Sequence, residues 1–443
     1  MLATIVFTAI PYGTVQPWWI AFFECLVFLI AGLSVIDAAV SKKWPEDWSL
    51  VVPLLAFVLF AVVQSMPLFS GPGPMEPRTS LSADPYGTRL FAIQLLALTL
   101  VLLLLRSYTS SKARLRKLIY VIIGVGVASA LFGIIRQHFQ QAPGFLLPGL
   151  PIGNRSFGQF INRNHFALLI EMSLGLTLGL IAGEIGRQRR ALTLIPVGLF
   201  LWVALIYSNS RGGIIASLCQ LLFLAVLVFP VRRGVSEQTQ AESGSRGFSA
   251  FASGVGIRVV LIVCLIGLFV YGVGWIGGEP VVSNFQLAAT DFSQQEMENN
   301  INTSRREIWS ATWRMVKAHP LTGVGFGGYW VGITRFHRAS GQITPQQAHN
   351  DYLEILASGG LIACGLVLWF LVEFLRIARE RLRSPDPYYR AARLGALTGI
   401  FGVAIHSFVD FGIHIAINTL VLFALLVIVT ERDQLAPLAK PED

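Results

Sequence analysis

The sequence predicts an all-α, polytopic integral membrane protein with about 12 transmembrane helices and one long polar loop that contains short helices. Its 443 residues are 54% hydrophobic and only 13% charged, with a mean hydropathy of +0.62. Predominantly apolar runs recur along the chain, and each is long enough to cross a hydrocarbon core of about 30 Å. A soluble domain of this length does not need so much apolar surface.

Eleven segments have the length and composition of a span. They lie near 18–40, 49–67, 88–106, 116–135, 165–183, 190–208, 213–230, 257–277, 351–376, 392–408 and 413–431. Residues 2–10 are apolar but short, and Pro11-Tyr12-Gly13 then turns the chain, so we expect a short first helix there. The apolar stretch that begins at Met1-Leu2-Ala3 has no basic region at its start, which argues against a cleavable signal peptide.

The expected organisation has four parts: N-terminal transmembrane helices (1–277), a polar loop (278–350), C-terminal transmembrane helices (351–431) and a tail (432–443). Most of the 34 Lys and Arg residues fall in one set of alternate loops. These loops lie near 42–43, 106–117, 187–190, 232–258 and 376–393, and the tail adds two more basic residues. Because such loops stay in the cytoplasm, we expect 278–350 to face the periplasm of a bacterium. This topology accounts for the net charge of +9 without nucleic acid.

Two short connections on the expected periplasmic side contain arginines, although most basic residues fall on the cytoplasmic side. Asn162-Arg163-Asn164-His165-Phe166 begins a span, where Arg163 either snorkels to the interface or contacts a phosphate or sugar. Ser208-Asn209-Ser210-Arg211-Gly212-Gly213 joins two spans with almost no loop. An arginine this close to hydrocarbon is unfavourable by a few kcal/mol unless it finds an anion. The two glycines allow backbone or ligand to approach closely, so Arg211 is a candidate for substrate binding.

A third group lies in the long loop, at Asn302-Thr303-Ser304-Arg305-Arg306-Glu307-Ile308-Trp309. Thr303 or Ser304 can cap a helix that Pro320 stops, with Trp309, Trp313 and Val316 on the side that faces the membrane or the other helices. Arginine in a first helical turn opposes the helix dipole. It becomes favourable when an anion binds there, because the free N–H groups and the guanidinium then act together.

The segment Leu321-Thr322-Gly323-Val324-Gly325-Phe326-Gly327-Gly328-Tyr329 contains four glycines. No strand precedes it and no Lys-Ser/Thr follows, so it lacks the context of a nucleotide-binding loop. We interpret it as a flexible turn.

His349 lies just before the span at 351–376, in Gln347-Ala348-His349-Asn350-Asp351-Tyr352-Leu353-Glu354. The positive end of a helix disfavours imidazolium, so a neutral ring beside Asp351 or Glu354 can take a proton from a hydroxyl. An interfacial histidine bonded to backbone is the simpler alternative. With arginines expected at the same depth, we favour a catalytic base.

His406, Asp410 and His414 are spaced by four residues, which would place them on one face of a helix at its outer end. A zinc site is one interpretation, and a hydrogen-bonded hairpin between two spans is the other, which we favour. Glu171 lies inside a span, and we expect it to bond to a neighbouring helix.

These motifs resemble the O-antigen ligase and O-antigen polymerase superfamily, most closely the ligases of lipopolysaccharide assembly. The resemblance covers roughly 150–425 and rests on Asn162-Arg163-Asn164-His165-Phe166, Ser210-Arg211-Gly212-Gly213, the run from Arg305 through His349 to Glu354, and Gly359-Gly360-Leu361-Ile362. It implies a twelve-helix glycosyltransferase of the bacterial inner membrane, multi-pass, with its active site at the periplasmic face. Such ligases move a polysaccharide from undecaprenyl diphosphate to the lipid A core, with no metal, nucleotide or other cofactor.

The resemblance also implies roles for residues. The essential arginines and the loop histidine of the family correspond to Arg211, Arg305 and His349, with Arg306 as the neighbouring alternative to Arg305. We place Arg163, Arg306, Asp351, Tyr352, His406 and Asp410 among the residues that bind substrate. The expected partners are the lipid-linked glycan donor, the lipid A-core acceptor and membrane lipid.

Two other functions remain open at this stage. A polymerase of the same superfamily would join repeat units on the lipid carrier, and the motifs alone do not separate it from a ligase. A transporter would place arginines along a mid-membrane pathway, with helices broken near the bilayer centre. The expected clustering of polar residues at one face argues against transport.

Overall fold

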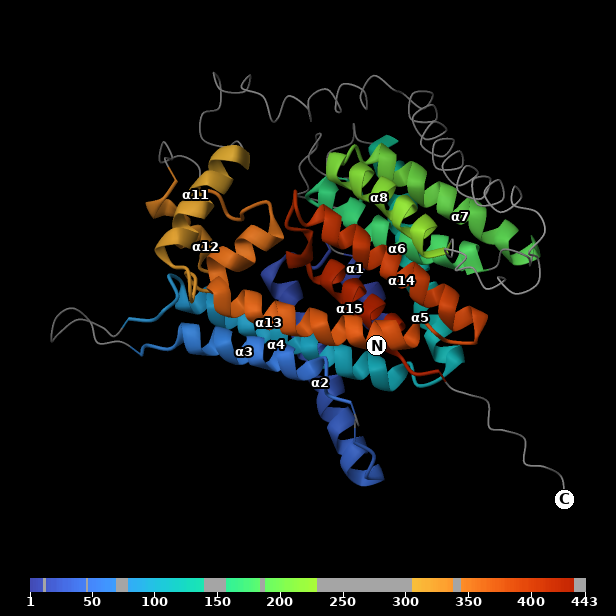
Figure 1. Ribbon diagram of the computed structural model, residues 1–443, viewed down its shortest axis with the longest axis horizontal. Helices are drawn as coiled ribbons and strands as arrows, with labels where there is room; N and C mark the ends of the chain where they lie inside the picture. The colour runs from blue at the N-terminus through green and yellow to red at the C-terminus, as the bar shows by residue number, and fades with distance from the viewer. Residues whose placement is uncertain are drawn as a thin grey trace, which may run out of the picture.

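The computed structural model describes residues 1–10, 13–44, 47–68, 79–138, 157–183, 188–228, 305–337 and 344–433. Within these ranges the chain is helical and contains no β-strand, and Phe157 and Phe160 form an isolated bridge. Figure 1 shows the helices gathered in one bundle, with α2 projecting from it. The all-α fold class is therefore confirmed.

Most of the expected spans appear as helices with bounds close to those predicted. They are α1 (Leu2–Ala9), α2 (Pro17–Ser41), α3 (Val51–Ser65), α4 (Pro85–Tyr108), α5 (Lys112–His138), α6 (Arg163–Gly183), α7 (Gln188–Tyr207), α8 (Arg211–Val228), α13 (Asp351–Arg381), α14 (Pro387–His406) and α15 (Ala416–Thr430). The expected span at 257–277 lies outside the described residues.

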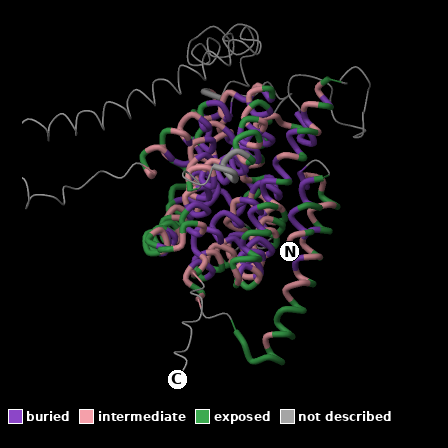
Figure 2. The backbone as a smooth tube through the Cα atoms, turned by 90° about the vertical axis from the view of Figure 1, so that its right-hand side faces the viewer, coloured by how far each residue is buried: buried purple, intermediate pink, exposed green. Residues whose placement is uncertain are grey.

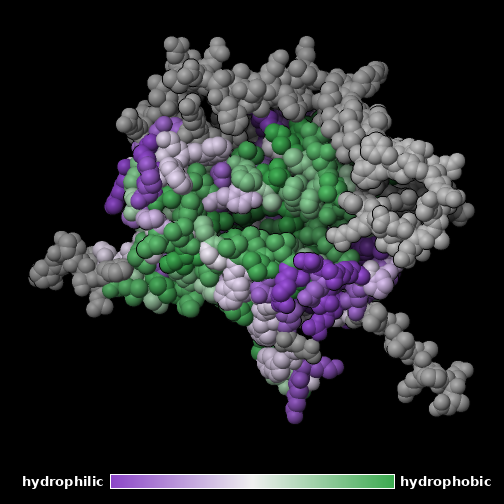
Figure 3. Space-filling model, in the orientation of Figure 1, coloured by the Kyte–Doolittle hydropathy of each residue, from purple (hydrophilic) through white to green (hydrophobic). Residues whose placement is uncertain are grey.

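The helices have the length and surface of membrane spans. Six described helices are long and apolar enough to cross a membrane, and Val51–Ser65, Thr193–Tyr207 and Ala416–Thr430 are shorter apolar helices. Buried residues fill the interior of the bundle (Figure 2), and the face seen in Figure 3 is broadly hydrophobic across its middle. An apolar exterior around a packed interior is the arrangement that a lipid environment favours.

Loops that the charge pattern assigns to one side of the membrane meet at one end of the bundle. Arg106 Nη2 pairs with Asp47 Oδ2 at 2.7 Å. Lys112 pairs with Asp386 between the first residue of α5 and the N-cap of α14. Fully buried Arg393 binds Asp433, beyond the end of α15. Three connections and the residues that follow α15 therefore share one end, as the predicted alternation requires.

The closest helix contact in the bundle joins α6 and α14 in antiparallel fashion. Small residues recur every four positions on both helices: Gly175, Gly179 and Gly183 on α6 face Gly399, Gly395 and Ala391 on α14. A Cβ added to Gly179 would lie 2.1 Å from Gly395 Cα. The two backbones therefore touch, as in membrane helix pairs whose interfaces consist of small residues.

A third helix locks this pair through a buried amide. Gln220 of α8 is fully buried, and its Nε2 donates to the backbone oxygens of Glu171 on α6 and Thr398 on α14, at 3.1 Å each. Gly402 provides the space, because a Cβ there would lie 2.1 Å from Gln220 Nε2. The amide thus bonds to backbone oxygens of two helices, in addition to the hydrogen bonds within each helix. These bonds fix α8 against both.

α13 is not the continuous helix that the sequence predicted. Gly360 has φ 61° and ψ −160°, a region that only glycine adopts readily, and the helix breaks there. The segment at 320–325 fills the break: Leu361 N donates to Pro320 O at 2.9 Å, while Val324 N and Gly325 N donate to Ala357 O and Ser358 O. Freed backbone groups are thereby satisfied inside the protein, which is a requirement at membrane depth.

The glycine-rich segment is a turn, as predicted, but the hydrogen bonds show it to be fixed rather than flexible. Gly323, Gly325 and Gly327 all have positive φ. Gln64 of α3 donates to Thr322 O at 2.6 Å, and Thr88 of α4 donates to Phe326 O. A Cβ on Gly325 would lie 2.2 Å from Ser82 Oγ. The turn therefore ties α3, α4 and α13 together.

The loop helix predicted before Pro320 is α11 (Arg305–Ala318). Its buried side consists of Ile308, Ala311, Thr312, Met315 and Val316. Val316 is buried against the bundle, whereas Trp313 is 51% exposed, so the structure assigns different surroundings to these two residues of the predicted side. The short elements α12 (Tyr329–Gly332) and η2 (Ile333–Arg335) follow, and Figure 1 shows them beside α11 at one end of the bundle.

Gly179→Ala should destabilise the protein by about 1–3 kcal/mol, because the added methyl group overpacks the contact with Gly395. Gly124→Ala on α5 is the matched control, since a Cβ there meets nothing within 4 Å. Thermal unfolding of both variants in detergent measures the difference. A Gly179→Ala protein that unfolds at the temperature of the control would contradict the close contact.

Candidate active site

Five helix ends meet around the connection between α14 and α15, at the end of the bundle that also holds α11. These are the starts of α6, α8, α13 and α15 and the end of α14, and the connection contains the short helix η3 (Gly412–His414). Asp351 N donates to Ser407 O at 2.9 Å, which joins α13 to this connection. Asn418 Nδ2 donates to His165 O and Gly412 O, which joins it to α6.

Asp410 stands between two imidazoles and is only 1% exposed. Its Oδ1 lies 3.5 Å from His349 Nδ1, and its Oδ2 lies 3.6 Å from His165 Nε2. Phe411 packs edge-on against both rings, with centroids 4.8 Å apart in each case. Burial alone would raise the pKa of Asp410, but the contact with His349 and the charges of the surrounding imidazoles lower it to about 2. The carboxylate is therefore ionised at neutral pH.

His349 is presented on a fixed piece of backbone. Its φ is 51°, a left-handed conformation that few non-glycine residues adopt. On one side, Trp309 Nε1 of α11 donates to Ala348 O at 2.9 Å, and Ala348 N donates to Glu354 Oε2 at 2.8 Å. On the other, Asn350 caps α13 by accepting from Leu353 N. The ring itself is 35% exposed, so it is held in place yet accessible.

The acidic partner of His349 differs from the expected one. The sequence suggested Asp351 or Glu354, but these two carboxylates face His414, whose Nε2 lies 3.4 Å from Asp351 Oδ1 and 3.6 Å from Glu354 Oε1. In the first turn of α13, both carboxylates therefore lie against His414. Asp410 takes their place, although it is distant in sequence.

His414 lies outside the spanning helices, in η3. Burial would lower its pKa, but the Glu354 and Asp351 carboxylates raise it to about 9. His414 is therefore a cation at neutral pH, and it holds the start of α13 against the α14–α15 connection.

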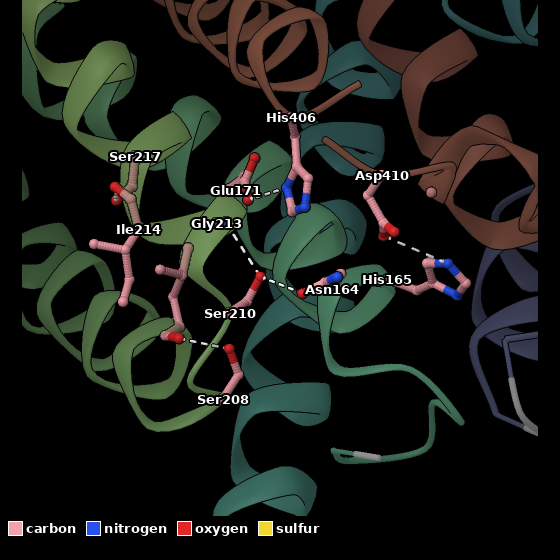
Figure 4. A network of polar contacts seen from close by, with 12 residues as sticks. Asn164, His165, Glu171, Ser208, Ser210, Gly213, Ile214, Ser217, His406 and Asp410 are labelled. Atoms are coloured by element: carbon pink, nitrogen blue, oxygen red, sulfur yellow. Dashed lines mark hydrogen bonds and ion pairs between the residues drawn. The ribbon is translucent and has the colours of Figure 1, made fainter. Parts of the chain in front are cut away.

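Glu171 and His406 form the deepest part of the network. His406 Nδ1 lies 2.7 Å from Glu171 Oε1, and both side chains are almost fully buried. This contact between α6 and α14 is the helix-to-helix bond expected for Glu171. The start of α8 covers the pair: a Cβ on Gly212 would lie 2.9 Å from His406 Nε2, and one on Gly213 would lie 3.1 Å from Glu171 Oε1. Figure 4 shows the pair beside the Asp410–His165 contact.

Side chains, rather than the backbone or ligand that the sequence suggested, therefore approach Gly212 and Gly213 closely. Asn209 has φ 58° and turns the chain between α7 and α8. Ser210 caps α8 by accepting from Gly213 N at 3.2 Å and donates to Asn164 Oδ1 at 2.8 Å. Arg211 is therefore fixed beside the start of α6.

The predicted arginines share one local setting. Arg163 is the first residue of α6, Arg211 of α8 and Arg305 of α11. The N-terminus of a helix carries partial positive charge and free N–H groups, so each arginine stands where an anion is favoured. The side chains of Arg305 and Arg306 lie outside the description, so their roles stay predictions.

His406, Asp410 and His414 do not lie on one helical face, because α14 ends at His406. The prediction failed because Ser407 to Phe411 form a turn rather than a further turn of helix. The three side chains contact different acids and imidazoles. Among the described residues, no three His, Cys, Asp or Glu side chains are placed to hold a metal ion together. Tyr352 donates from its hydroxyl to Ala404 O at 2.7 Å, which links α13 to α14.

Sequence reasoning gave no role to His165 and did not pair Glu171 with His406. His165 belongs to the motif at 162–166, but no residue near it in the sequence indicates that Asp410, more than two hundred residues away, is its partner. The recurrence of small residues every four positions on α6 and α14 was the available signal for the second pair, since it aligns the two helices.

The fold and this cluster define a polytopic membrane protein with an acid–histidine site at one end of its helix bundle, next to arginine-bearing helix starts. The family model described as O-Antigen ligase matches residues 196–370. That segment carries the domain of the O-antigen ligase family, which confirms the resemblance seen in the motifs. It includes Arg211, Arg305 and His349, whereas Arg163, His406 and Asp410 lie outside it. A search of curated proteins gave no match.

The raised pKa of His414 predicts a loss of stability at alkaline pH. A pKa above the value in the unfolded chain, about 6.5, stabilises the folded state fully below that value. The contribution disappears as pH rises through about 9. We expect thermal stability to fall between these pH values, and His414→Gln to show a weaker fall over the same interval. A variant with the same pH dependence as the original protein would contradict the His414–Asp351–Glu354 contact.

Proposed function

We propose that the protein is a glycosyltransferase that moves O-antigen polysaccharide from undecaprenyl diphosphate to a sugar hydroxyl of lipid A-core. The reaction would take place at the periplasmic face of the bacterial inner membrane. The observation that carries the proposal is the accessible His349 ring held against the buried, ionised Asp410. The match to the O-antigen ligase family supports the substrate class.

The proposed reaction is a single displacement at the anomeric carbon. The acceptor hydroxyl oxygen attacks that carbon while the bond from carbon to the diphosphate oxygen breaks. The electron pair of that bond leaves with the lipid diphosphate, and the hydroxyl proton passes to His349. One displacement inverts the configuration of the anomeric carbon. The sugar is already activated by the diphosphate, so the step needs no nucleotide.

In this mechanism Asp410 orients His349. Its Oδ1 faces His349 Nδ1, which leaves Nε2 as the atom that receives the proton. The negative carboxylate also stabilises the imidazolium that forms during the step. General-base catalysis of this kind typically contributes about 10²–10⁴ in rate.

The arginines would act on the donor. Arg211, with Arg305 or Arg306, would hold the diphosphate and stabilise the charge that develops on it as the bond breaks. Arg163, the first residue of α6, would add a phosphate or sugar contact. The backbone N–H groups at each helix start would also favour a bound anion, in addition to the charge of the guanidinium.

A reconstituted assay tests the proposal. Purified protein is incubated with lipid-linked glycan and, separately, with lipid A-core or with further lipid-linked glycan. We expect lipid A-core to be extended and the anomeric configuration of the new bond to be inverted. Extension of the lipid-linked chain alone would instead identify a polymerase, and no transfer to either acceptor would refute both.

His349→Ala should reduce transfer by about 10²-fold or more, because the general base is removed. The protein should still elute as folded, since the His349 ring is partly exposed and the backbone contacts of Ala348 remain. His319→Ala, at an exposed histidine just after α11, is the matched control. Normal transfer by His349→Ala would end the assignment of the base.

A further inference from the structure

One exposed face of α13 changes from apolar to basic towards the end of the helix, far from the acid–histidine cluster at its start. Leu368, Val372 and Leu375 are 61%, 54% and 60% exposed, and they follow one another at helical spacing. Arg379 is exposed one turn further along the same face. Ile377, on the opposite face, is buried in the bundle. The outward face therefore meets lipid along its apolar part and ends in positive charge.

The basic part of this face extends past the end of the helix. Leu382 N donates to Ala378 O at 2.9 Å, and Arg383 N donates to Glu380 O at 3.3 Å, so the chain keeps a helical turn as far as Arg383. Arg383 is exposed and lies one turn beyond Arg379. Figure 3 shows hydrophilic side chains gathered at this end of α13, beside the hydrophobic middle of the molecule. Arg379 and Arg383 therefore stand on the same side of the chain.

The acids of the same helix interact with a different arginine. Glu373 accepts from Arg376 Nε at 3.0 Å and from its Nη2 at 2.7 Å, and Glu380 also interacts electrostatically with Arg376. Within the part of the chain that the structure describes, no residue forms a hydrogen bond or ion pair with the Arg379 or Arg383 side chain. Two neighbouring guanidinium groups without an acid partner attract an anion from outside the protein.

We propose that this face of α13 binds an acidic phospholipid, with the phosphate at Arg379 and Arg383 and an acyl chain along Leu368, Val372 and Leu375. Arg379 lies four residues, or about 6 Å, beyond Leu375 along the helix axis. The headgroup layer on each side of a bilayer is about 5–8 Å thick. The guanidinium groups therefore lie at the depth of lipid phosphates when the apolar part of the face lies at the depth of acyl chains.

A lipid fits this face better than a soluble anion does. An acidic peptide would use the charge of the two arginines but not the apolar residues that precede them, whereas a phospholipid uses both. Basic residues close to a membrane surface also favour acidic lipids over zwitterionic ones. The proposal does not depend on the transfer reaction proposed above.

Photo-crosslinking of the full-length protein in phosphatidylcholine nanodiscs tests this. Two probes carry the same diazirine-bearing acyl chain, one with a phosphatidylglycerol headgroup and the other with a phosphatidylcholine headgroup. We expect the phosphatidylglycerol probe to label α13 between Leu368 and Leu375 about fivefold more strongly or better, the effect of one basic residue beside an acidic headgroup. The difference should shrink at high salt, because salt screens exposed charges.

Two matched variants separate a site on α13 from the general positive charge of this side of the protein. Arg379→Gln with Arg383→Gln should remove the preference for phosphatidylglycerol, while labelling by the other probe persists. Lys42→Gln with Lys43→Gln removes two exposed charges expected on the same side of the membrane, at the end of α2, and should leave the preference unchanged.

Three results would overturn the proposal. They are equal labelling by both probes, a preference that survives the arginine substitutions, and a preference that the lysine substitutions reduce equally. Displacement of the phosphatidylglycerol probe by a soluble polyglutamate peptide would also overturn it, because an acidic protein segment would then be the occupant.

Discussion

The backbone contact between α6 and α14 is the constraint on which the site depends. Glycines at Gly175 and Gly179 allow two helices to touch without side chains between them, and that contact fixes their relative rotation and height. Glu171 lies one turn before Gly175, and His406 ends α14, so the same register brings these two side chains to 2.7 Å. A small shift of one helix against the other would be unfavourable, because it would leave two buried ionisable groups without partners in apolar surroundings.

The rest of the cluster is built outward from this pair. The start of α8 packs over the Glu171–His406 pair through Gly212 and Gly213. Arg211, the first residue of α8, therefore lies next to these two glycines in the chain. The end of α14 sets where the following turn begins, and that turn carries Asp410 to both His165 and His349. A shift of α14 by one turn, about 5.4 Å, would therefore remove the carboxylate from both imidazoles at once. The packing of α14 inside the bundle therefore determines which side chains meet at its end.

Much of the fold could be predicted from the sequence, because membrane spans are set by length and hydrophobicity, which are local properties. The start of the loop helix at Arg305 followed from local cues in the same way, whereas α8 begins at Arg211, two residues before the predicted span. The break at Gly360 did not, because it exists only when the segment at 320–325 supplies hydrogen bonds from elsewhere in the chain. The partner of His349 was missed for a related reason. Local reasoning favours Asp351 and Glu354, whereas Asp410 reaches the ring only through tertiary packing.

The broken helix bears on the choice between transport and group transfer. Discontinuous helices in transporters leave backbone groups that line a path for substrate. In α13 the groups freed at the break are used by the segment at 320–325, and Gln64 closes the junction by donating to Thr322 O and Ser358 O. The break therefore serves to anchor the loop that follows α11. It holds that loop at one end of the bundle, beside the start of α13.

This anchoring gives the site two separate supports. His349 is held by Trp309 of α11 and by the start of α13, and it faces Asp410 from the α14–α15 connection. Arg211 belongs to α8 and is fixed through Ser210 and Asn164 to α6. If His349 accepts the proton and Arg211 binds the donor as proposed, their positions on different elements would let them stand on opposite sides of the reacting carbon, which an in-line displacement requires. In the proposed transfer, this arrangement would keep the Asp410 carboxylate behind the His349 ring, so that its negative charge would stabilise His349 without directly facing the diphosphate of the donor.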